Sequence, residues 1–287
     1  MDTSVLTFLA APFVASLILT GIHAYLGVHV VERGVIFVDL SLAQIAALGA
    51  TIGLLLPITG GDPHSPVTYW ISLAFTFLGA FIFSTIRSRR ARIPQEAIIG
   101  ICYAVSSAAA ILAMSKATSE SEHLKDMLVG NILAVSWTDV LKTAILYGAI
   151  GIFHYVCRHK FLAISMDHKK AEAEGISVKV WDFLFYASFG FVVTSSVSIA
   201  GVLLVFCYLI VPSVAAMLYA DSIGRRLAIG WTMGTVVSAL GVYLSLQLDL
   251  PTGATIVCTF GLVLILMAAV RPLLQRKAPV HELQRAD

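Results

Sequence analysis

The stretch ERGVIFVDLSLAQIAALGA, residues 32–50, places one carboxylate, Asp39, near the start of an otherwise apolar run. The chain as a whole is similarly apolar, with 58% hydrophobic residues, 13% charged residues and a mean hydropathy of +0.89. A membrane core about 30 Å thick requires roughly 20 apolar residues for each helical crossing. The composition therefore predicts an all-α, multi-pass membrane protein rather than a soluble globular one.

Nine segments along the chain have the length and composition of a transmembrane helix. Together they predict a single membrane domain over residues 1–287, with all helices in one bundle. The segments are 5–30, 35–56, 68–87, 96–115, 139–157, 180–198, 200–219, 226–247 and 252–270. The N-terminal residues lack the basic region of a secretory signal, so we expect the first helix to be retained.

Clusters of basic residues predict which loops face the cytoplasm. They lie at 87–92, 158–170 and 225–226, and an odd number of spans then places Met1 outside. The apolar segment 127–137 is too short to cross alone and fits a re-entrant or interfacial helix. If it crossed together with a neighbouring segment, there would be ten spans and Met1 would lie inside.

The sequence contains no nucleotide-binding or hydrolytic motif. It lacks G-x-x-x-x-G-K-[ST], so we expect no ATPase activity in this chain, and any ATP would be hydrolysed by a partner subunit. It also lacks H-E-x-x-H and G-x-S-x-G, which argues against a protease or hydrolase. A net charge of +2 does not indicate nucleic acid as a partner.

The longest polar segment, about 159–179, predicts a short amphipathic helix on the cytoplasmic side that ends at Gly175. Acidic residues such as Asp167 and Glu172 alternate there with basic residues such as Lys169. Such a surface is either a solvated loop helix or a docking surface for a soluble partner.

Within this segment, AEAEGI (171–176) resembles the Glu-Ala-Ala and Gly coupling-helix motif by which ABC importer permeases contact their ATPase subunits. The opening stretch is consistent with the same family, because GVIFVDLSLAQIAALG (34–49) resembles the Gly-Asp-x-x-Ser-His helix of ABC-type divalent-metal permeases. Three more stretches resemble the family in the same order: 96–114, 128–140 and 198–218. The resemblance covers about residues 10–270.

The resemblance implies the permease subunit of an ATP-driven importer of divalent metal ions, with zinc, manganese or iron as transported substrate and no cofactor of its own. Its implied partners are an ATP-binding ABC subunit, an extracytoplasmic metal-binding protein and a second copy of the chain, in the bacterial plasma membrane. ATP-driven closure of the partner subunits would be transmitted through the coupling segment, in which the implied contact residues are Asp167, Glu172, Ala173 and Gly175.

Asp39 is the leading candidate for a metal-binding or gating residue, because a carboxylate in a membrane helix is costly unless it faces water, a cation or the bundle interior. An interfacial role is the alternative, since Asp39 lies only six residues past Arg33 and would be placed to cap a helix or to pair with a basic residue.

The family pattern has a histidine four residues after the aspartate, whereas this chain has Ala43. Gln44 is the nearest polar side chain, but it lies about 140° from Asp39 around a helix and cannot simply replace an imidazole. His29, in the preceding span, is either a path-lining nitrogen ligand or a packed, interfacial histidine. The candidate metal residues are therefore Asp39, His29 and Gln44, and a lone hard carboxylate suits manganese or iron no worse than zinc.

Two residues in a later part of the chain are candidates for a hinge. Pro212 removes a backbone hydrogen bond and Gly201 permits close helix approach, although a simple packing kink is the alternative. A rival function is a self-sufficient secondary carrier, in which Asp39 would carry protons or sodium. A membrane scaffold without transport activity is a third possibility.

Overall fold

The computed structural model of the chain describes residues 3–59, 65–86, 94–115 and 132–275. These residues form helices and turns, and no strand occurs among them. The predicted all-α fold is confirmed.

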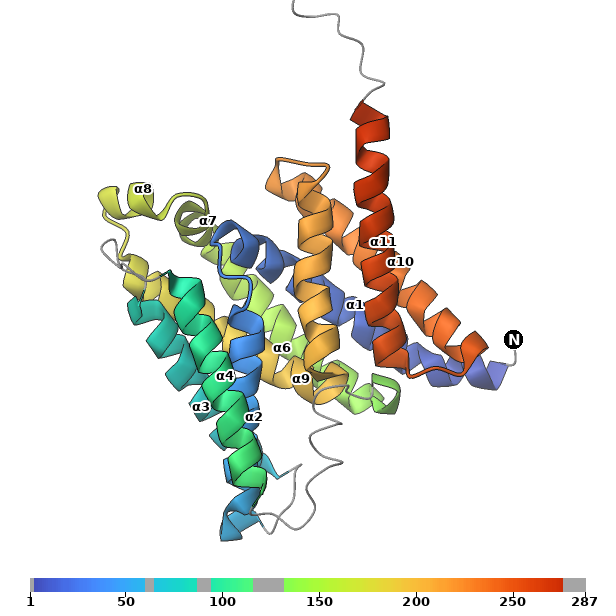
Figure 1. The fold of residues 1–287 in the computed structure, drawn as a ribbon, viewed down its shortest axis with the longest axis horizontal. Coiled ribbons are helices and arrows are strands. Elements are labelled where there is room, and N and C mark those ends of the chain that lie inside the picture. Colours follow the sequence, from blue (N-terminus) through green and yellow to red (C-terminus); the bar gives the residue numbers. More distant parts are fainter. Residues whose placement is uncertain (1–2, 60–64, 87–93, 116–131, 276–287) are drawn as a thin grey trace, which may run out of the picture.

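Helix α1 (Thr3–Glu32) lies at the centre of the bundle, where it packs against α9 and α10 (Figure 1). Its apolar residues are distributed around the whole helix rather than along one stripe, which is typical of a helix buried on all sides. Leu19, Leu26 and Val30 are completely buried.

The next three long helices stand side by side at one edge of the bundle (Figure 1). They are α2 (Val38–Leu55), followed by the 3-10 turn η1 (Pro57–Thr59), α3 (Pro66–Ile86) and α4 (Gln95–Met114). Helices α2 and α3 approach closely because Gly49 has no side chain: a Cβ there would lie 2.9 Å from the Cα of Ser72. Small residues at such contacts are typical of helix packing in membranes.

A second group of helices leads from the bundle to the polar segment. It comprises the 3-10 turn η2 (Ile132–Ala134), α6 (Trp137–Val156), α7 (Arg158–Met166) and α8 (His168–Ala173). Helix α6 begins with a capping box formed by Ser136 and Asp139. The chain bends by 74° between α6 and α7, so that α7 runs across the end of the bundle.

The prediction of a single amphipathic helix in the polar segment is wrong in one respect, because the structure has two helices there, α7 and α8. Asp167 has an extended backbone, and its side chain accepts hydrogen bonds from the backbone N–H groups of Lys169 and Lys170, which starts a new helix. The segment is also less solvated than predicted, since Phe161 and Ile164 of α7 are completely buried in the core.

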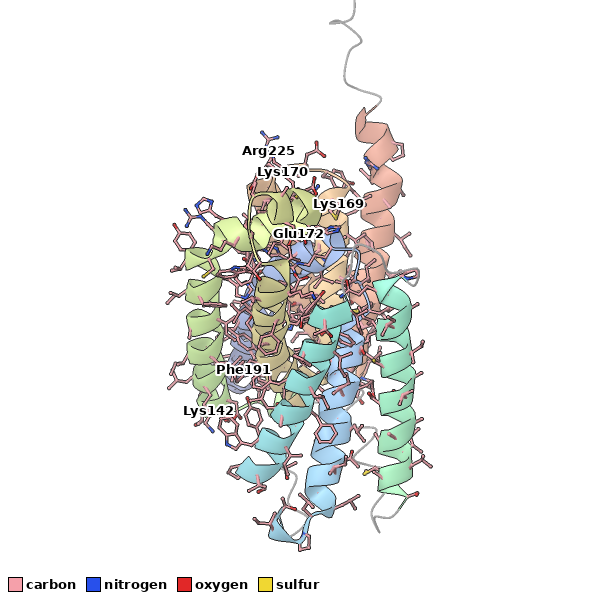
Figure 2. The ribbon with its side chains drawn as sticks, turned by 90° about the vertical axis from the view of Figure 1, so that its left-hand side faces the viewer. Lys142, Lys169, Lys170, Glu172, Phe191 and Arg225 are labelled. Atoms are coloured by element: carbon pink, nitrogen blue, oxygen red, sulfur yellow. The ribbon has the colours of Figure 1, made fainter. Side chains whose placement is uncertain are left out.

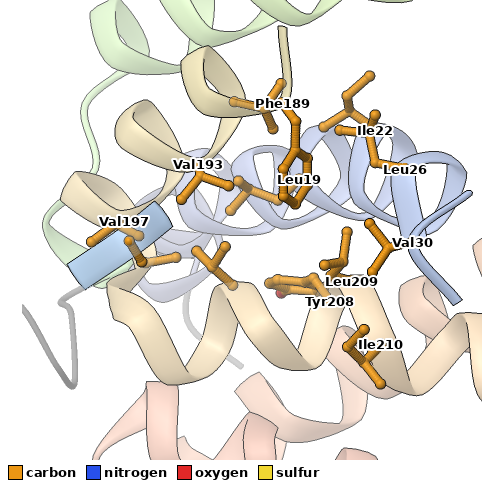
Figure 3. Packing of buried hydrophobic residues seen from close by; sticks show 14 of the residues in the cluster. Leu19, Ile22, Leu26, Val30, Phe189, Val193, Val197, Tyr208, Leu209 and Ile210 are labelled. Carbon is orange, nitrogen blue, oxygen red and sulfur yellow. The ribbon is translucent and has the colours of Figure 1, made fainter. Parts of the chain in front are cut away.

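Helix α9 (Val178–Met217) contains 40 residues, which would extend about 60 Å if straight, twice the hydrocarbon thickness. It is instead broken at Gly201, where φ is 75° and ψ is 161°. The two arms pack on α1 from different sides: Figure 3 shows Val193 of the first arm and Tyr208 of the second arm gathered around Leu19 and Leu26.

The fold ends with α10 (Ile223–Leu248) and α11 (Thr252–Gln275). Seven of the described helices are long and apolar enough to cross a membrane, and the bent pair α6–α7 raises the number to eight. All nine predicted segments coincide with these helices, because α9 contains two of them, 180–198 and 200–219. Residues 132–134 of the doubtful segment 127–137 form η2, and its first five residues lie outside the described ranges.

The outer faces of the bundle are apolar, as a lipid-facing surface requires. Leu112 of α4 and Leu266 of α11 are 70% and 63% exposed. The charged residues collect at the ends instead: Figure 2 shows Lys169, Lys170 and Arg225 at the same end of the molecule. Two of the three predicted cytoplasmic loops therefore lie together, and the third, 87–92, is outside the described residues.

Candidate functional site

Asp39 lies in the first turn of α2 and is almost completely buried, with 1% of its surface exposed. Its Oδ1 atom has no hydrogen-bond partner among the described residues. The interfacial alternative predicted that Asp39 would cap the helix or pair with a basic residue. However, the N-cap residue of α2 is Phe37, and the nearby Arg33 is paired with Asp182. Asp39 therefore presents a buried oxygen with an unused lone pair.

The residues around Asp39 on α2 do not supply an obvious second ligand. Ala43 packs in the hydrophobic core, and the side chain of Gln44 is largely buried, with 9% of its surface exposed. Among the described residues, no group of three or more His, Cys, Asp or Glu side chains is placed to hold a metal ion. A complete metal cage within one chain is thus absent from the described part of the structure.

His29 lies in the last turn of α1 and points toward α7 and α9. Its Nδ1 atom is 2.8 Å from the Oγ of Ser165, which donates its own proton to the carbonyl oxygen of Phe161. Ser165 must therefore accept from Nδ1–H, so that in the neutral imidazole the Nε2 atom carries the lone pair. Nε2 has no hydrogen-bond partner among the described residues and lies in an aromatic environment formed by Tyr25 and Phe185.

Sequence reasoning missed a buried ion pair next to this histidine. Arg33, just after α1, donates to Asp182 in the first arm of α9 at 2.6 Å, and both side chains are inaccessible to solvent. The Nε atom of Arg33 donates to Ser165 at 2.9 Å, and the guanidinium lies 3.9 Å from the centre of the Phe185 ring. The only sequence signal was a pair of opposite charges near the ends of two predicted spans.

The polar segment presents a compact exposed surface beyond α7. Figure 2 shows Glu172, Lys169 and Lys170 at the end of the molecule, and residues 172–175 are all exposed. Helix α8 ends as predicted: Gly175 has a φ of +84°. The N–H of Gly175 donates to the carbonyl of Glu172, and that of Ile176 donates to the carbonyl of Ala171, which is a Schellman motif.

Asp167 is exposed, and its hydrogen bonds from the backbone N–H groups of Lys170 and Lys169 lower its pKa below the usual range. A carboxyl with a lowered pKa stabilises α8 above its ordinary pKa, and that stabilisation is lost as the pH falls through the lowered value. Asp167→Ala is expected to increase the amide hydrogen exchange of Lys169 and Lys170 several-fold at neutral pH.

Asp167→Asn is the matched control, because asparagine is an equally good N-cap but does not titrate in this range. The asparagine variant should keep the protection of both amides against exchange. This protection should no longer fall at low pH, because asparagine does not titrate. Equal exchange in the alanine variant and the wild type would show that the cap contributes nothing to α8.

The two hinge candidates differ in their backbone geometry. Gly201 adopts a left-handed conformation that leaves the helical region, which glycine does without a steric penalty. Pro212 lies inside the second arm of α9, is buried, and interrupts no helical φ/ψ in its vicinity. The bend of α9 is therefore located at Gly201.

A family model described as the ABC 3 transport family matches residues 5–271. The chain belongs to this family. The ABC 3 match covers all described membrane helices, and it places the chain among permease subunits of ABC transport systems, as multi-pass proteins of the bacterial plasma membrane. The predicted family is confirmed, and the self-sufficient carrier is not favoured.

Similar proteins support this assignment in sequence and in structure. Manganese transport system membrane protein MntC of Listeria monocytogenes is 28% identical over 206 residues, 68% of this chain and 71% of the relative. Chelated iron transport system membrane protein YfeD of Yersinia pestis is 24% identical over 225 residues, 75% of each chain. PsaBC from Streptococcus pneumoniae, solved in complex with a Fab, matches with a TM-score of 0.75 and 25% identity, covering 91% of this chain and 90% of that chain.

Proposed function

We propose that this ABC 3 family member is the membrane-spanning subunit of an ATP-driven importer of divalent metal ions. The observation that carries the proposal is Asp39, a buried carboxylate whose Oδ1 has no partner among the described residues. An ionised carboxylate in such a position is costly unless a cation or water reaches it. The names of the similar proteins, which refer to manganese and chelated iron, support a metal as that cation.

The metal is proposed to be bound by two copies of the chain. One carboxylate supplies at most two ligand atoms, whereas manganese, iron and zinc require four to six. A homodimer would bring a second Asp39 to the pathway, and water would complete the coordination shell. Because Ala43 provides no imidazole, the preference for zinc is weakened, and we propose manganese or iron as the principal substrate.

The exposed surface of α8 is proposed as the docking site of the ATP-binding subunit. Residues Asp167, Glu172, Ala173 and Gly175 lie on or beside this short helix, at the same end of the molecule as Arg225. Its rigid ends, an aspartate cap and a Schellman motif, support a role in transmitting force rather than a solvated loop. A separate extracytoplasmic protein would deliver the metal from the opposite side, and ATP hydrolysis would belong to the partner.

His29 is proposed as a secondary residue of the metal path, because the lone pair of Nε2 is directed away from its bond to Ser165. If metal passes it, His29→Ala should reduce the rate of uptake about tenfold, the effect of losing one weak ligand interaction. Uptake of radioactive manganese by cells that produce the variant in normal amount tests this. Unchanged uptake would remove His29 from the path and leave it as a packing residue.

Of the two hinge candidates, Gly201 rather than Pro212 is proposed as the flexible point of α9 during alternating access. A non-helical glycine between two packed arms is a position at which a small change in φ and ψ reorients one arm.

The metal content of cells tests the proposed function directly. Manganese, iron and zinc are measured together in cells with the gene, without it, and with the gene restored on a plasmid. Loss of one of the three metals on deletion, with recovery on restoration, is the expected result. Equal contents of all three metals during growth in metal-limited medium would contradict the proposal.

A further inference from the structure

The end of α1 is tied to three other helices by two consecutive charged residues. Glu32 forms an ion pair with Arg226, near the start of α10. Arg33 forms the buried ion pair with Asp182 of α9 and also donates to Ser165 of α7. We call Arg33, Ser165 and Asp182 the Arg33 cluster.

On one side, the Arg33 cluster is fixed to the helix that leads to the exposed surface of α8. Ser165 is the last residue but one of α7, and only Asp167 separates α7 from α8. The other side of α7 is anchored in the bundle, because Phe161 is completely buried and stacks on His154 of α6 with ring centres 4.4 Å apart. A displacement of α8 must therefore pull on α7 and on its bond to Arg33.

On the other side, the Arg33 cluster is connected to Asp39 by a short and well-anchored loop. A Schellman motif closes α1, with Gly34 at a φ of +66° and the N–H of Val35 donating to the carbonyl of Val30. Val35 and Val38 are buried in the core, so the loop has little freedom. Movement of Arg33 would consequently shift the start of α2, where Asp39 lies.

The chemistry of the cluster indicates a need for defined geometry. A buried ion pair adds little stability compared with apolar residues of the same volume, because both charges must be removed from water. The planar guanidinium of Arg33 contacts Asp182, Ser165 and the face of the Phe185 ring in fixed directions, which a lysine cannot reproduce. These contacts join α1, α7 and α9 at the end of the bundle that carries α8 (Figure 1).

We propose that the Arg33 cluster transmits movement of α8 to Asp39. Arg33 is a positioning residue in this proposal and does not touch the metal. This proposal rests on the proposed function, because it assigns a route between the ATPase docking surface and the metal site. It predicts that the Arg33 cluster controls the coupling ratio, which is the number of metal ions transported per ATP hydrolysed.

The test uses the complete transporter complex in proteoliposomes and the double variant Arg33→Met/Asp182→Leu, which removes both charges and retains apolar volume. The complex is expected to assemble and to hydrolyse ATP, while its coupling ratio for manganese falls at least tenfold. Tyr147→Phe is the control, since it removes the hydroxyl that bonds Ser195 at 3.0 Å and also the carbonyl of Val192, with no described contact to the Arg33 cluster. Its coupling ratio should equal that of the wild type.

A second variant keeps the proposal testable if the double variant does not assemble. Arg33→Lys retains a positive charge for Asp182 but loses the separate donor to Ser165, so its coupling ratio should fall while the KM for metal stays unchanged. A wild-type coupling ratio in whichever of the two variants assembles would overturn the proposal that the Arg33 cluster transmits this movement. Failure of the wild-type complex to couple uptake to ATP would instead contradict the proposed function.

Discussion

Replacement of Asp39 by asparagine is expected to reduce metal uptake at least about tenfold without impairing the fold. The amide keeps the shape of the side chain but removes the negative charge that a divalent cation requires. Because Oδ1 of Asp39 has no partner among the described residues, no native hydrogen bond to that atom is lost, and loss of a buried charge should leave the unfolding temperature unchanged or slightly raised.

The measurement is the initial rate of manganese uptake by the complex in proteoliposomes, together with its thermal unfolding. Ser41→Ala is the matched control, because Ser41 is completely buried on the same helix and its hydroxyl also has no partner among the described residues. Its uptake should equal that of the wild type. Normal uptake by Asp39→Asn over the full range of metal concentrations would show that Asp39 is not part of the metal path.

Substitution of Gly175 by valine is expected to separate ATP hydrolysis from uptake. Gly175 has a φ of +84°, which a β-branched residue adopts only at a cost of about 1–3 kcal/mol, so the end of α8 should rearrange. Apart from its immediate chain neighbours, no described residue has a heavy atom within 4 Å of a Cβ placed there, so the effect arises from the backbone and the exposed surface rather than from a clash. We expect ATPase activity to persist and uptake to fall about tenfold or more.

Gly175→Asn separates the two possible causes, because asparagine tolerates the left-handed conformation. It should retain most of the coupled uptake if the backbone at the end of α8 is the important feature. Glu172→Lys tests the charge of the docking surface independently and is expected to uncouple as well. Normal coupling in Gly175→Val would count against α8 as the docking helix.

The sequence was sufficient to predict the membrane class, the helices and their order, because the length of an apolar run is set by the thickness of the bilayer. It also predicted a break between 198 and 200, where the structure has the left-handed Gly201. The division of the polar segment into α7 and α8 was missed, since a helical pattern continues across Asp167 and only its side-chain hydrogen bonds reveal the cap.

The candidate site was only partly predictable. Asp39 was identified because a single carboxylate in an apolar run is conspicuous, but its lack of a partner depends on the packing of α2 against the rest of the bundle. The Arg33–Asp182 ion pair joins residues 149 positions apart, a contact that no local pattern in a single sequence contains. The sequence left His29 as either a ligand in the metal path or a packed histidine, and its described contacts are with Ser165 and aromatic rings.

The dependence of uptake on ATP tests the account most directly. The chain is reconstituted in proteoliposomes together with the proposed extracytoplasmic metal-binding protein, with and without the proposed ATP-binding subunit. Manganese uptake is measured with ATP, without ATP, and with a proton or sodium gradient alone. We predict uptake only when both the ATP-binding subunit and ATP are present, and no effect when the ion gradients are collapsed. Uptake by the chain alone, driven by an ion gradient in the absence of ATP, would contradict the account.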